Sequence, residues 1–291
     1  MSKQSRARAA DKAAGGSLPL LEQNPFFIRW GGLVASCIMV LAALVAYHNS
    51  FSGSFIADDE WSITDNPTIR HFSSALSPPS HAGVGGRPLL NLTYAFNYAL
   101  GGLNVWGYHA FNLLVHALTG FTLFGIVRRT LLRPTLGKRF GVEAVPLALA
   151  VAVIWIVHPL QTEAVTFISQ RAECLMGLFY LLTLYCFIRG LESGAPARWL
   201  TLSVAACFLG ALSKEIIMTA PVLVLLYDRT FATGSFREVG SICVFGTDLC
   251  PGLVDEVRKC TEADLLKSVG VDLCAAVLEF AMLDSPEFVD F

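Results

Sequence analysis

The sequence predicts an all-α protein in which about six helices cross a membrane as one bundle. Three observations support this fold class. Hydrophobic residues make up 54% of the chain and charged residues 15%, against roughly 25% charged residues in an average globular protein. Apolar runs recur at close to the length of about 20 residues that crosses a bilayer. Basic residues are concentrated in alternate loops, as in proteins that cross a membrane several times.

Six apolar runs are the predicted membrane spans, at residues 30–48, 108–127, 144–158, 174–188, 199–213 and 216–227. The first run has no small-residue cleavage pattern, so we expect a retained helix rather than a cleaved signal peptide. Because the N-terminal residues are basic and rich in alanine and serine, we expect a cytoplasmic tail over residues 1–29. Residues 30–231 are then the predicted membrane domain.

The stretch Pro88–Val127 contains forty residues without Asp, Glu, Lys or Arg, and it decides the predicted topology. It holds either two spans, or one span preceded by a helix that lies on the membrane surface. Residues 89–100 carry two asparagines, a threonine and two tyrosines, a composition typical of an interfacial helix with aromatic side chains at the headgroups. We therefore place this helix in a long outer loop, residues 49–107.

With this arrangement, fourteen basic residues fall on one side of the membrane and four on the other. The positive-inside rule places the N-terminus and the side with fourteen in the cytoplasm. The opposite, extracytoplasmic face receives Arg70, Arg87, Arg171 and Lys214. The predicted location is a bacterial inner membrane or the endoplasmic reticulum membrane, with the functional face in the periplasm or the lumen.

The C-terminal part changes in character, with ten acids against three basic residues from Ser241 onward. We expect residues 232–291 to be a small soluble appendage of unknown role, or the divergent end of a truncated chain. The eight cysteines do not predict a disulfide framework, because four lie in apolar runs, where a thiol behaves as a small hydrophobe. The other four lack zinc-site spacing: Cys243, Cys250, Cys260 and Cys274.

Three adjacent acids in the first outer loop, Asp58, Asp59 and Glu60, are the leading candidates for chemistry. Charged residues near a span are usually found where they meet water or a partner, which favours a site. Adjacent carboxylates do not all ionise freely, so one of them can act as a general base. The alternative is a solvated acidic loop or the start of a helix.

Two cationic positions on the same face are candidates for binding a phosphate. Arg87 opens the interfacial helix, where its guanidinium can form a bidentate contact with a lipid phosphate. The alternative is a headgroup anchor without specificity. Lys214-Glu215 lies in a very short turn between the fifth and sixth spans. We expect a phosphate clamp or a buried ion pair there, with a solvated turn as the alternative.

Polar residues also recur inside the second span, where His109, Asn112 and His116 share one face. Such groups face a cavity or form hydrogen bonds with a neighbouring helix. The two histidines are about 10 Å apart along the helix axis, so we expect no metal site. Beyond the third span, three further polar groups lie on the outer face: His158, Glu163 and Arg171.

Jointly, these groups describe a cavity that is lined by acids and rimmed by cations. Such a cavity suits the transfer of a sugar from a polyprenyl phosphate. The leaving phosphate needs a cation, and the acceptor hydroxyl needs a carboxylate base. We expect no cofactor and no nucleic-acid partner, because these groups meet the chemical needs of the reaction.

An ordered series of motifs runs from Trp30 to Phe231: Phe55–Asp59, Arg87-Pro88-Leu89, Phe96–Asn104, Tyr108-His109 with Asn112 and His116, His158-Pro159 with Thr162–Val165, Arg171, Leu212–Glu215 and Leu226–Asp228. This series resembles the transmembrane-and-tetratricopeptide-repeat O-mannosyltransferases and their bacterial relatives, which have the GT-C glycosyltransferase architecture. Two departures stand out. Gln161 replaces a histidine that family members often carry, and the later helices and repeats of the family do not follow.

The resemblance implies a polyprenyl- or dolichyl-phosphate sugar donor, with mannose favoured, and a protein hydroxyl as acceptor. It implies that Asp58 or Asp59 is the base. The expected contacts to the donor phosphate and lipid are Arg87, His109, Arg171 and Lys214, supported by Glu60, Asn112, His116, His158, Glu163 and Glu215. The alternative is a truncated or inactive membrane scaffold that binds a lipid or a partner protein. A transporter fits less well, because we find no internal repeat.

Overall fold

The computed structural model describes residues 25–79 and 83–233, and every regular element in these ranges is a helix. Residues 1–24 and 234–291, which hold most of the two predicted tails and the four C-terminal cysteines, lie outside the described residues. The chain divides into two units, Met1–Val224 and Leu225–Phe291. The second unit begins inside α11 (Ala220–Asp228), which is followed by η7 (Arg229–Thr233). The predicted domain boundaries stay a prediction, and the following paragraphs concern the first unit.

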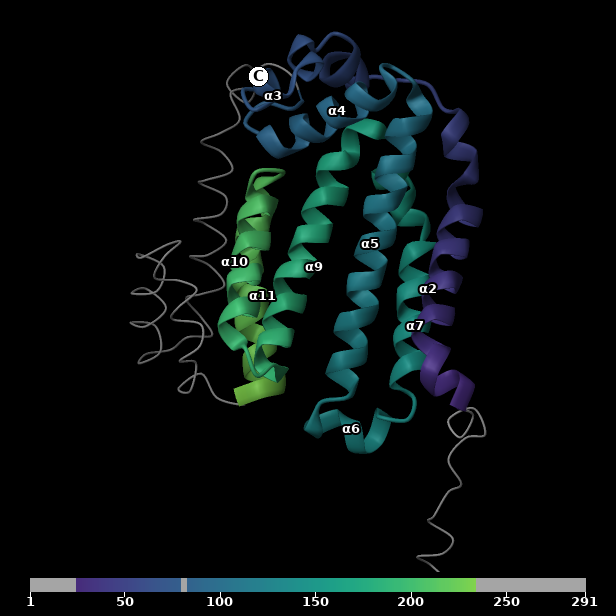
Figure 1. The fold of residues 1–291 in the computed structure, drawn as a ribbon, viewed down its shortest axis with the longest axis vertical. Helices are drawn as coiled ribbons and strands as arrows, with labels where there is room; N and C mark the ends of the chain where they lie inside the picture. The colour runs from purple at the N-terminus through teal and green to yellow at the C-terminus, as the bar shows by residue number, and fades with distance from the viewer. Residues whose placement is uncertain (1–24, 80–82, 234–291) are drawn as a thin grey trace, which may run out of the picture. The chain divides into compact units, whose positions relative to one another are not determined.

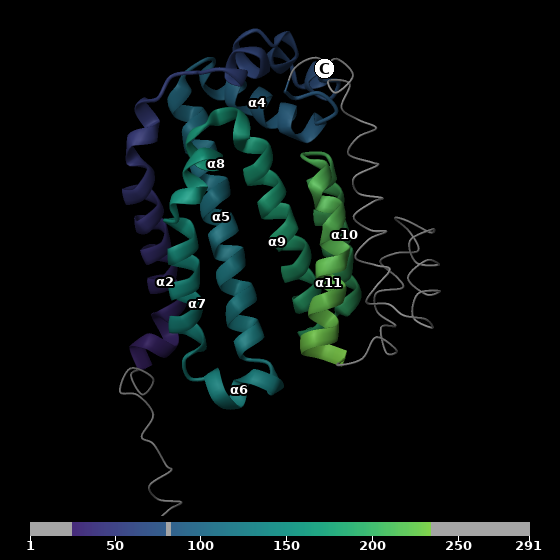
Figure 2. The same ribbon diagram turned by 180° about the vertical axis from the view of Figure 1, so that it is seen from behind.

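Five helices of the first unit run side by side: α2 (Pro25–Tyr47), α5 (Val105–Leu131), α7 (Ala144–Ile156), α9 (Arg171–Glu192) and α10 (Pro196–Ala211). Figures 1 and 2 show α5 in the middle, where it packs against α2, α7 and α9, while α9 packs against α10. Small residues permit the close approach. A Cβ atom at Gly120 of α5 would lie 2.6 Å from Ile156 Cδ1 of α7. The predicted all-α membrane bundle is confirmed.

Three helical segments are long and apolar enough to cross a membrane: Gly31–Ser52, Val105–Leu131 and Ile168–Glu192. They coincide with the first, second and fourth predicted spans. The third predicted span corresponds to α7, which makes a bend of 95° with α6 (Pro134–Phe140), and the pair counts as a fourth candidate if taken as one span. Because α10 is shorter, the total of six spans stays a prediction.

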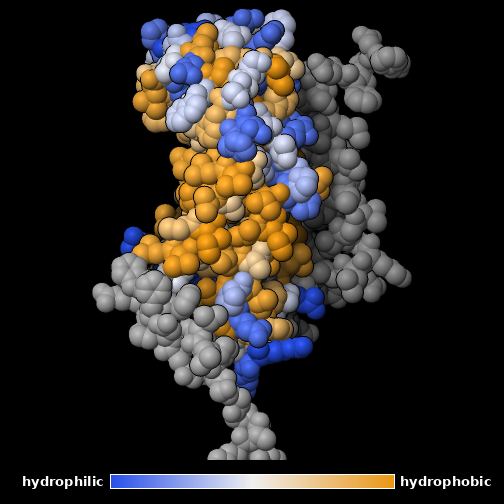
Figure 3. All heavy atoms as spheres, turned by 90° about the vertical axis from the view of Figure 1, so that its right-hand side faces the viewer, coloured by the Kyte–Doolittle hydropathy of each residue, from blue (hydrophilic) through white to orange (hydrophobic). Residues whose placement is uncertain are grey.

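The face of the bundle that Figure 3 shows carries a hydrophobic band between two hydrophilic ends. On α2, Leu41 and Val45 are 62% and 65% exposed, and on α7, Ile154 is 63% exposed. Exposed side chains of this size are costly in water but favourable against lipid. The band is therefore the surface that faces the hydrocarbon of the bilayer.

The first outer loop folds into short helices at one end of the bundle: η1 (His48–Ser52), η2 (Glu60–Thr64), η3 (Pro67–Arg70), α3 (Phe72–Ala75) and α4 (Pro88–Gly101). The helix expected over residues 89–100 is α4, which lies across this end (Figure 1). Pro88 starts it, and Gly102, with φ of 61°, ends it in a conformation that favours glycine. Its buried Asn91 donates to Ala75 O at 2.9 Å and accepts from Asn66 Nδ2 at 2.9 Å.

The orientation of the bundle can be tested because α3 and α6 lie at opposite ends (Figure 1). We expect that a cysteine placed at Ser73 of α3 reacts with an impermeant maleimide from the extracytoplasmic side. A cysteine at Leu136 of α6 should react only from the cytoplasmic side, since α6 carries Lys138 and Arg139. The measurement is labelling of sealed membranes in a variant without the native cysteines. Labelling of both positions from one side would contradict the topology.

Candidate active site

A polar cleft of about 220 Å³ lies at the end of the bundle that carries α4. Its lining comes from the first outer loop, the segment before α9, the start of α9 and the turn after α10: Asp58, Ser62, Gly83, Arg87, Ser169, Gln170, Ala172, Glu173 and Lys214. Three of the predicted site residues, Asp58, Arg87 and Lys214, are therefore brought together, although they are widely separated in the sequence.

The two adjacent aspartates lie in different environments. They begin the short helix that continues as η2, where consecutive side chains diverge by about 100°. Asp58 is exposed and lines the cleft. Asp59 is 1% exposed, and its carboxylate accepts backbone N–H groups from Ser169 at 2.7 Å and from Ile56 at 3.1 Å. Asp59 thus connects the first outer loop to the segment before α9.

Burial raises the pKa of the Asp59 carboxyl above its ordinary value, and the two backbone N–H groups partly oppose that rise. The backbone just before the pair is strained, because Ala57 has a φ of 48°. Among the described residues, Ala57 is the only non-glycine with positive φ. The bond from the Ile56 N–H to the Asp59 carboxylate closes this turn, which directly precedes Asp58.

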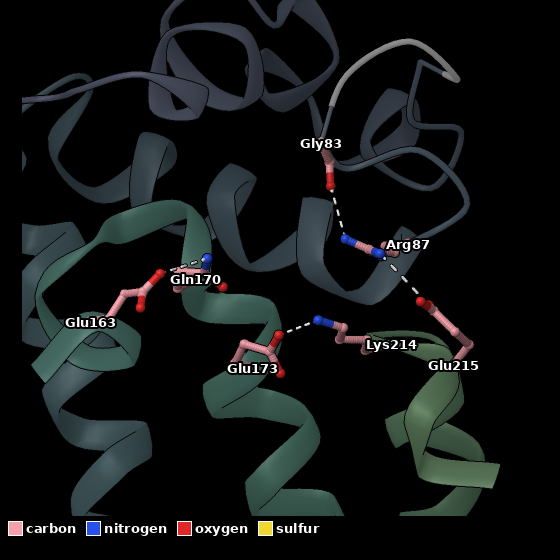
Figure 4. Close-up of polar contacts among 7 residues, drawn as sticks. All are labelled: Gly83, Arg87, Glu163, Gln170, Glu173, Lys214 and Glu215. Carbon is pink, nitrogen blue, oxygen red and sulfur yellow. Dashed lines mark hydrogen bonds and ion pairs between the residues drawn. The ribbon is translucent and has the colours of Figure 1, made fainter. Parts of the chain in front are cut away.

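Both cations of the cleft are engaged by carboxylates. Lys214 donates to Glu173 of α9, while Arg87 Nη2 lies 3.6 Å from a carboxylate oxygen of Glu215 and Arg87 Nη1 donates to Gly83 O (Figure 4). The Leu89 N–H also donates to Leu212 O at 3.3 Å. The Arg87–Glu215 and Leu89–Leu212 contacts connect the start of α4 to the turn after α10 and to the first residue of η6 (Glu215–Thr219).

Arg171 is fully buried beneath the outer loop and does not line the cleft. Its guanidinium donates to Asn112 Oδ1 at 2.7 Å, Asn97 Oδ1 at 2.7 Å and Tyr108 O at 3.1 Å. It also lies over the rings of Tyr94, Phe111 and Tyr108 at 4.5–5.6 Å. With 0% of its surface exposed, it is placed to join α4, α5 and α9 rather than to contact a phosphate.

The polar stripe of the second span faces the interior of the bundle. Asn112 accepts from Arg171, and His116 contacts Ile156 O at 2.9 Å and stacks on Trp155. The polar stripe therefore forms hydrogen bonds between helices, which is the second of the two possibilities expected from the sequence. His109 is 3% exposed, and neither ring nitrogen has a partner among the described residues. A Cβ atom at Gly53 would lie 2.9 Å from its Nε2, so only a glycine fits there without a shift.

The remaining predicted residues do not line the cleft. His158 is exposed, and its Nδ1 accepts from the Leu160 N–H at the start of η4 (Pro159–Gln161). Glu163, in α8 (Thr162–Thr166), accepts from Gln170 at 3.4 Å (Figure 4). Glu60 is exposed in η2. Glu215 does not line the cleft itself, but it forms an ion pair with Arg87, which does.

Glu173, which is not among the residues that the sequence predicts for the site, lines the cleft beside Lys214. A signal for it existed, because an acid at the outer end of a span is as unusual as the acids of the first loop. Ser169 and Gln170 of η5 (Ile168–Gln170) also line the cleft. Nothing in the sequence pattern marked these two residues as part of a site. Within the described residues, no three His, Cys, Asp or Glu side chains gather closely enough to hold a metal ion.

Several curated proteins that are similar to this chain are named protein O-mannosyl-transferases. The chain is 34% identical to the protein O-mannosyl-transferase Tmtc2 of Drosophila melanogaster over 205 residues, which is 64% of this chain and 20% of the relative. It is 31% identical to human TMTC2 over 67% of this chain and 24% of the relative, and 31% identical to human TMTC4 over 72% and 30%. Over about two thirds of its length, the chain is homologous to proteins of the TMTC family.

The chain spans about 20–30% of the length of these TMTC relatives. No family model and no solved structure matches it. The resemblance to the TMTC family that the motifs predict is confirmed, whereas the link to bacterial relatives stays a prediction.

Proposed function

We propose that this chain, which is similar to the TMTC proteins, carries the membrane active site of a protein mannosyltransferase, which moves mannose from a polyprenyl or dolichyl phosphate to a protein hydroxyl. The observation that carries the proposal is the cleft, where the exposed carboxylate of Asp58 lies in one lining with Arg87 and Lys214. The relatives are named protein O-mannosyl-transferases, which supports the sugar and the acceptor class.

In the proposed reaction, Asp58 is the general base. The acceptor oxygen forms a bond to the anomeric carbon as its proton passes to the Asp58 carboxylate, and the bond from that carbon to the phosphate oxygen breaks. Attack from the face opposite the phosphate inverts the anomeric centre. Asp59 is a positioning residue, because both of its oxygens accept backbone N–H groups and its side chain is buried.

The phosphate side of the reaction is assigned to Arg87 and Lys214. A phosphate that leaves with an added negative charge is stabilised by nearby cations, and no other cationic side chain lines the described cleft. At about 220 Å³ the cleft is smaller than the roughly 300–1,000 Å³ of sites for drug-sized ligands. It therefore suits the headgroup, while the polyprenyl tail lies among membrane lipids beside the hydrophobic band.

We place the site on the extracytoplasmic side, in the lumen of the endoplasmic reticulum for a protein like the animal relatives. The basic α6 at the other end of the bundle supports this orientation. A second candidate function is a scaffold that keeps the fold without catalysis. The observation behind this candidate is that the chain matches only 20–30% of its relatives' length. A transfer assay with defined lipid-phosphate sugars, on this chain and on a full-length relative, distinguishes the enzyme from the scaffold.

Arg87 offers a test of the phosphate assignment. Arg87→Lys keeps the charge but loses the planar fork, so we expect at least about a tenfold rise in the KM for the lipid-phosphate donor, more than a conservative exchange suggests. The measurement is donor titration in the transfer assay. Arg70→Lys is a matched control, because Arg70 lies over Tyr98 outside the cleft. An unchanged KM in Arg87→Ala would make Arg87 a headgroup anchor.

A further inference from the structure

We propose that Glu173 occupies the place of the donor phosphate when the cleft is empty, by holding Lys214, and that it recaptures Lys214 when the lipid phosphate product leaves. Glu215 holds Arg87 in the same way from outside the cleft. This inference rests on the proposed function. It assigns a role to Glu173, an acid that lines the cleft but is not the proposed general base.

The charges of the cleft lead to this proposal. Its lining contains two cations, Arg87 and Lys214, and two acids, Asp58 and Glu173, so its formal charge is zero. Each cation is already paired with a glutamate, Lys214 with Glu173 and Arg87 with Glu215 (Figure 4). An incoming phosphate meets cations that are not free, and it must take the place of a carboxylate to contact them.

The Lys214–Glu173 pair joins two elements that are held firmly. Glu173 lies in the first turn of α9, two residues after Arg171, whose guanidinium is locked by its buried partners. The Lys214 N–H donates to Gly210 O at 3.0 Å, and an added Cβ at Gly210 would lie 2.7 Å from Ile217. Because the backbones on both sides are fixed, the exchange of partners requires rotation of only the two side chains.

Both side chains remain accessible enough to exchange. The Lys214 and Glu173 side chains are 20% and 32% exposed, and those of Arg87 and Glu215 are 29% and 62% exposed. An ion pair that reaches water is weak, since its attraction is screened and its side chains lose rotational freedom. A phosphate oxygen of the donor can therefore replace the glutamate carboxylate without a large cost in free energy.

The reaction itself creates a need for such an exchange. The donor is a phosphodiester with one negative charge, whereas the product is a phosphate monoester with a charge of about −1.5 to −2 at pH 7. The transferred proton resides on Asp58, so the extra charge stays on the phosphate. Two unpaired cations would hold this product more tightly than the donor. A competing carboxylate at Lys214 lowers the affinity for the product and favours its release.

The test uses farnesyl phosphate as a probe of phosphate monoester binding to the full chain in detergent, measured by calorimetry. We expect Glu173→Gln to bind it roughly three- to fivefold more tightly than the wild type, the scale of a partly exposed ion pair. The difference should shrink at high salt. Asp65→Asn is a matched control with the same change in charge at an exposed position outside the cleft, and its affinity should equal that of the wild type.

The outcomes separate this inference from the proposed function. Equal or weaker binding by Glu173→Gln, with an unchanged thermal midpoint, would overturn the exchange while leaving the donor site in place. A gain of the same size in Asp65→Asn would assign the effect to net charge and also overturn it. An absence of binding by the wild type and every variant would remove both the donor site and the exchange.

Discussion

Asp58→Asn should lower the rate of mannosyl transfer by roughly 10²- to 10⁴-fold, the contribution of a positioned general base. The substituted amide would keep the size and polarity of the side chain but could not take the proton of the acceptor. Because Asp58 is exposed in the cleft, the thermal midpoint should stay within about 1–2 °C of the wild type, as for most surface substitutions. The measurement is kcat in the lipid-phosphate transfer assay, together with thermal unfolding in detergent.

Asp59→Asn is the matched comparison and should affect both quantities. Its amide offers one acceptor oxygen, whereas the carboxylate accepts the N–H groups of Ile56 and Ser169 with two. One N–H then faces an NH₂ group, which costs about 1–3 kcal/mol. The loop at Ala57 should loosen and Asp58 should lose its direction. If Asp58→Asn kept full activity while Asp59→Asn abolished it at unchanged stability, the roles of the two acids would be reversed.

Arg171→Leu should cause the largest loss of stability of any substitution considered. It removes the donor to Asn112 Oδ1, Asn97 Oδ1 and the Tyr108 carbonyl, all beneath the outer loop. A buried acceptor without a partner costs about 1–3 kcal/mol. We therefore expect at least about 3 kcal/mol in the free energy of unfolding, measured by denaturant titration in detergent micelles. Transfer should fall as well, because α9 carries Glu173 and follows Ser169.

Two variants bracket this prediction. Arg171→Lys keeps a charge but replaces five donors in a planar fork with three at one point, so most of the loss should remain. Arg198→Leu removes an exposed arginine from α10 and should change the free energy of unfolding by about 0.5 kcal/mol or less. Equal stabilities of Arg171→Leu and Arg198→Leu would show that the buried guanidinium does not hold α4, α5 and α9 together.

The prediction of α4 shows where sequence reasoning was sufficient. Pro88, the polar residues that follow and Gly101-Gly102 predict a short helix that does not cross the membrane, and α4 covers Pro88–Gly101. The polar positions were interpreted as contacts with headgroups, but Asn91 and Asn97 are buried in bonds to the outer loop, α5 and Arg171. The sequence shows that a polar group is present, but the identity of its partner depends on distant segments.

By itself, the sequence determined the all-α class, the apolar segments, the uneven distribution of basic residues along the chain and the resemblance to the TMTC family. These properties depend on composition and spacing along the chain, because transfer of a segment into lipid is a sum over its own residues. Only the tertiary structure decided that Asp58 faces the cleft and Asp59 the interior, that Arg171 is enclosed, and that Glu173 pairs with Lys214. Each of these depends on side-chain direction and on contacts between segments far apart in the chain, which a one-dimensional pattern does not contain.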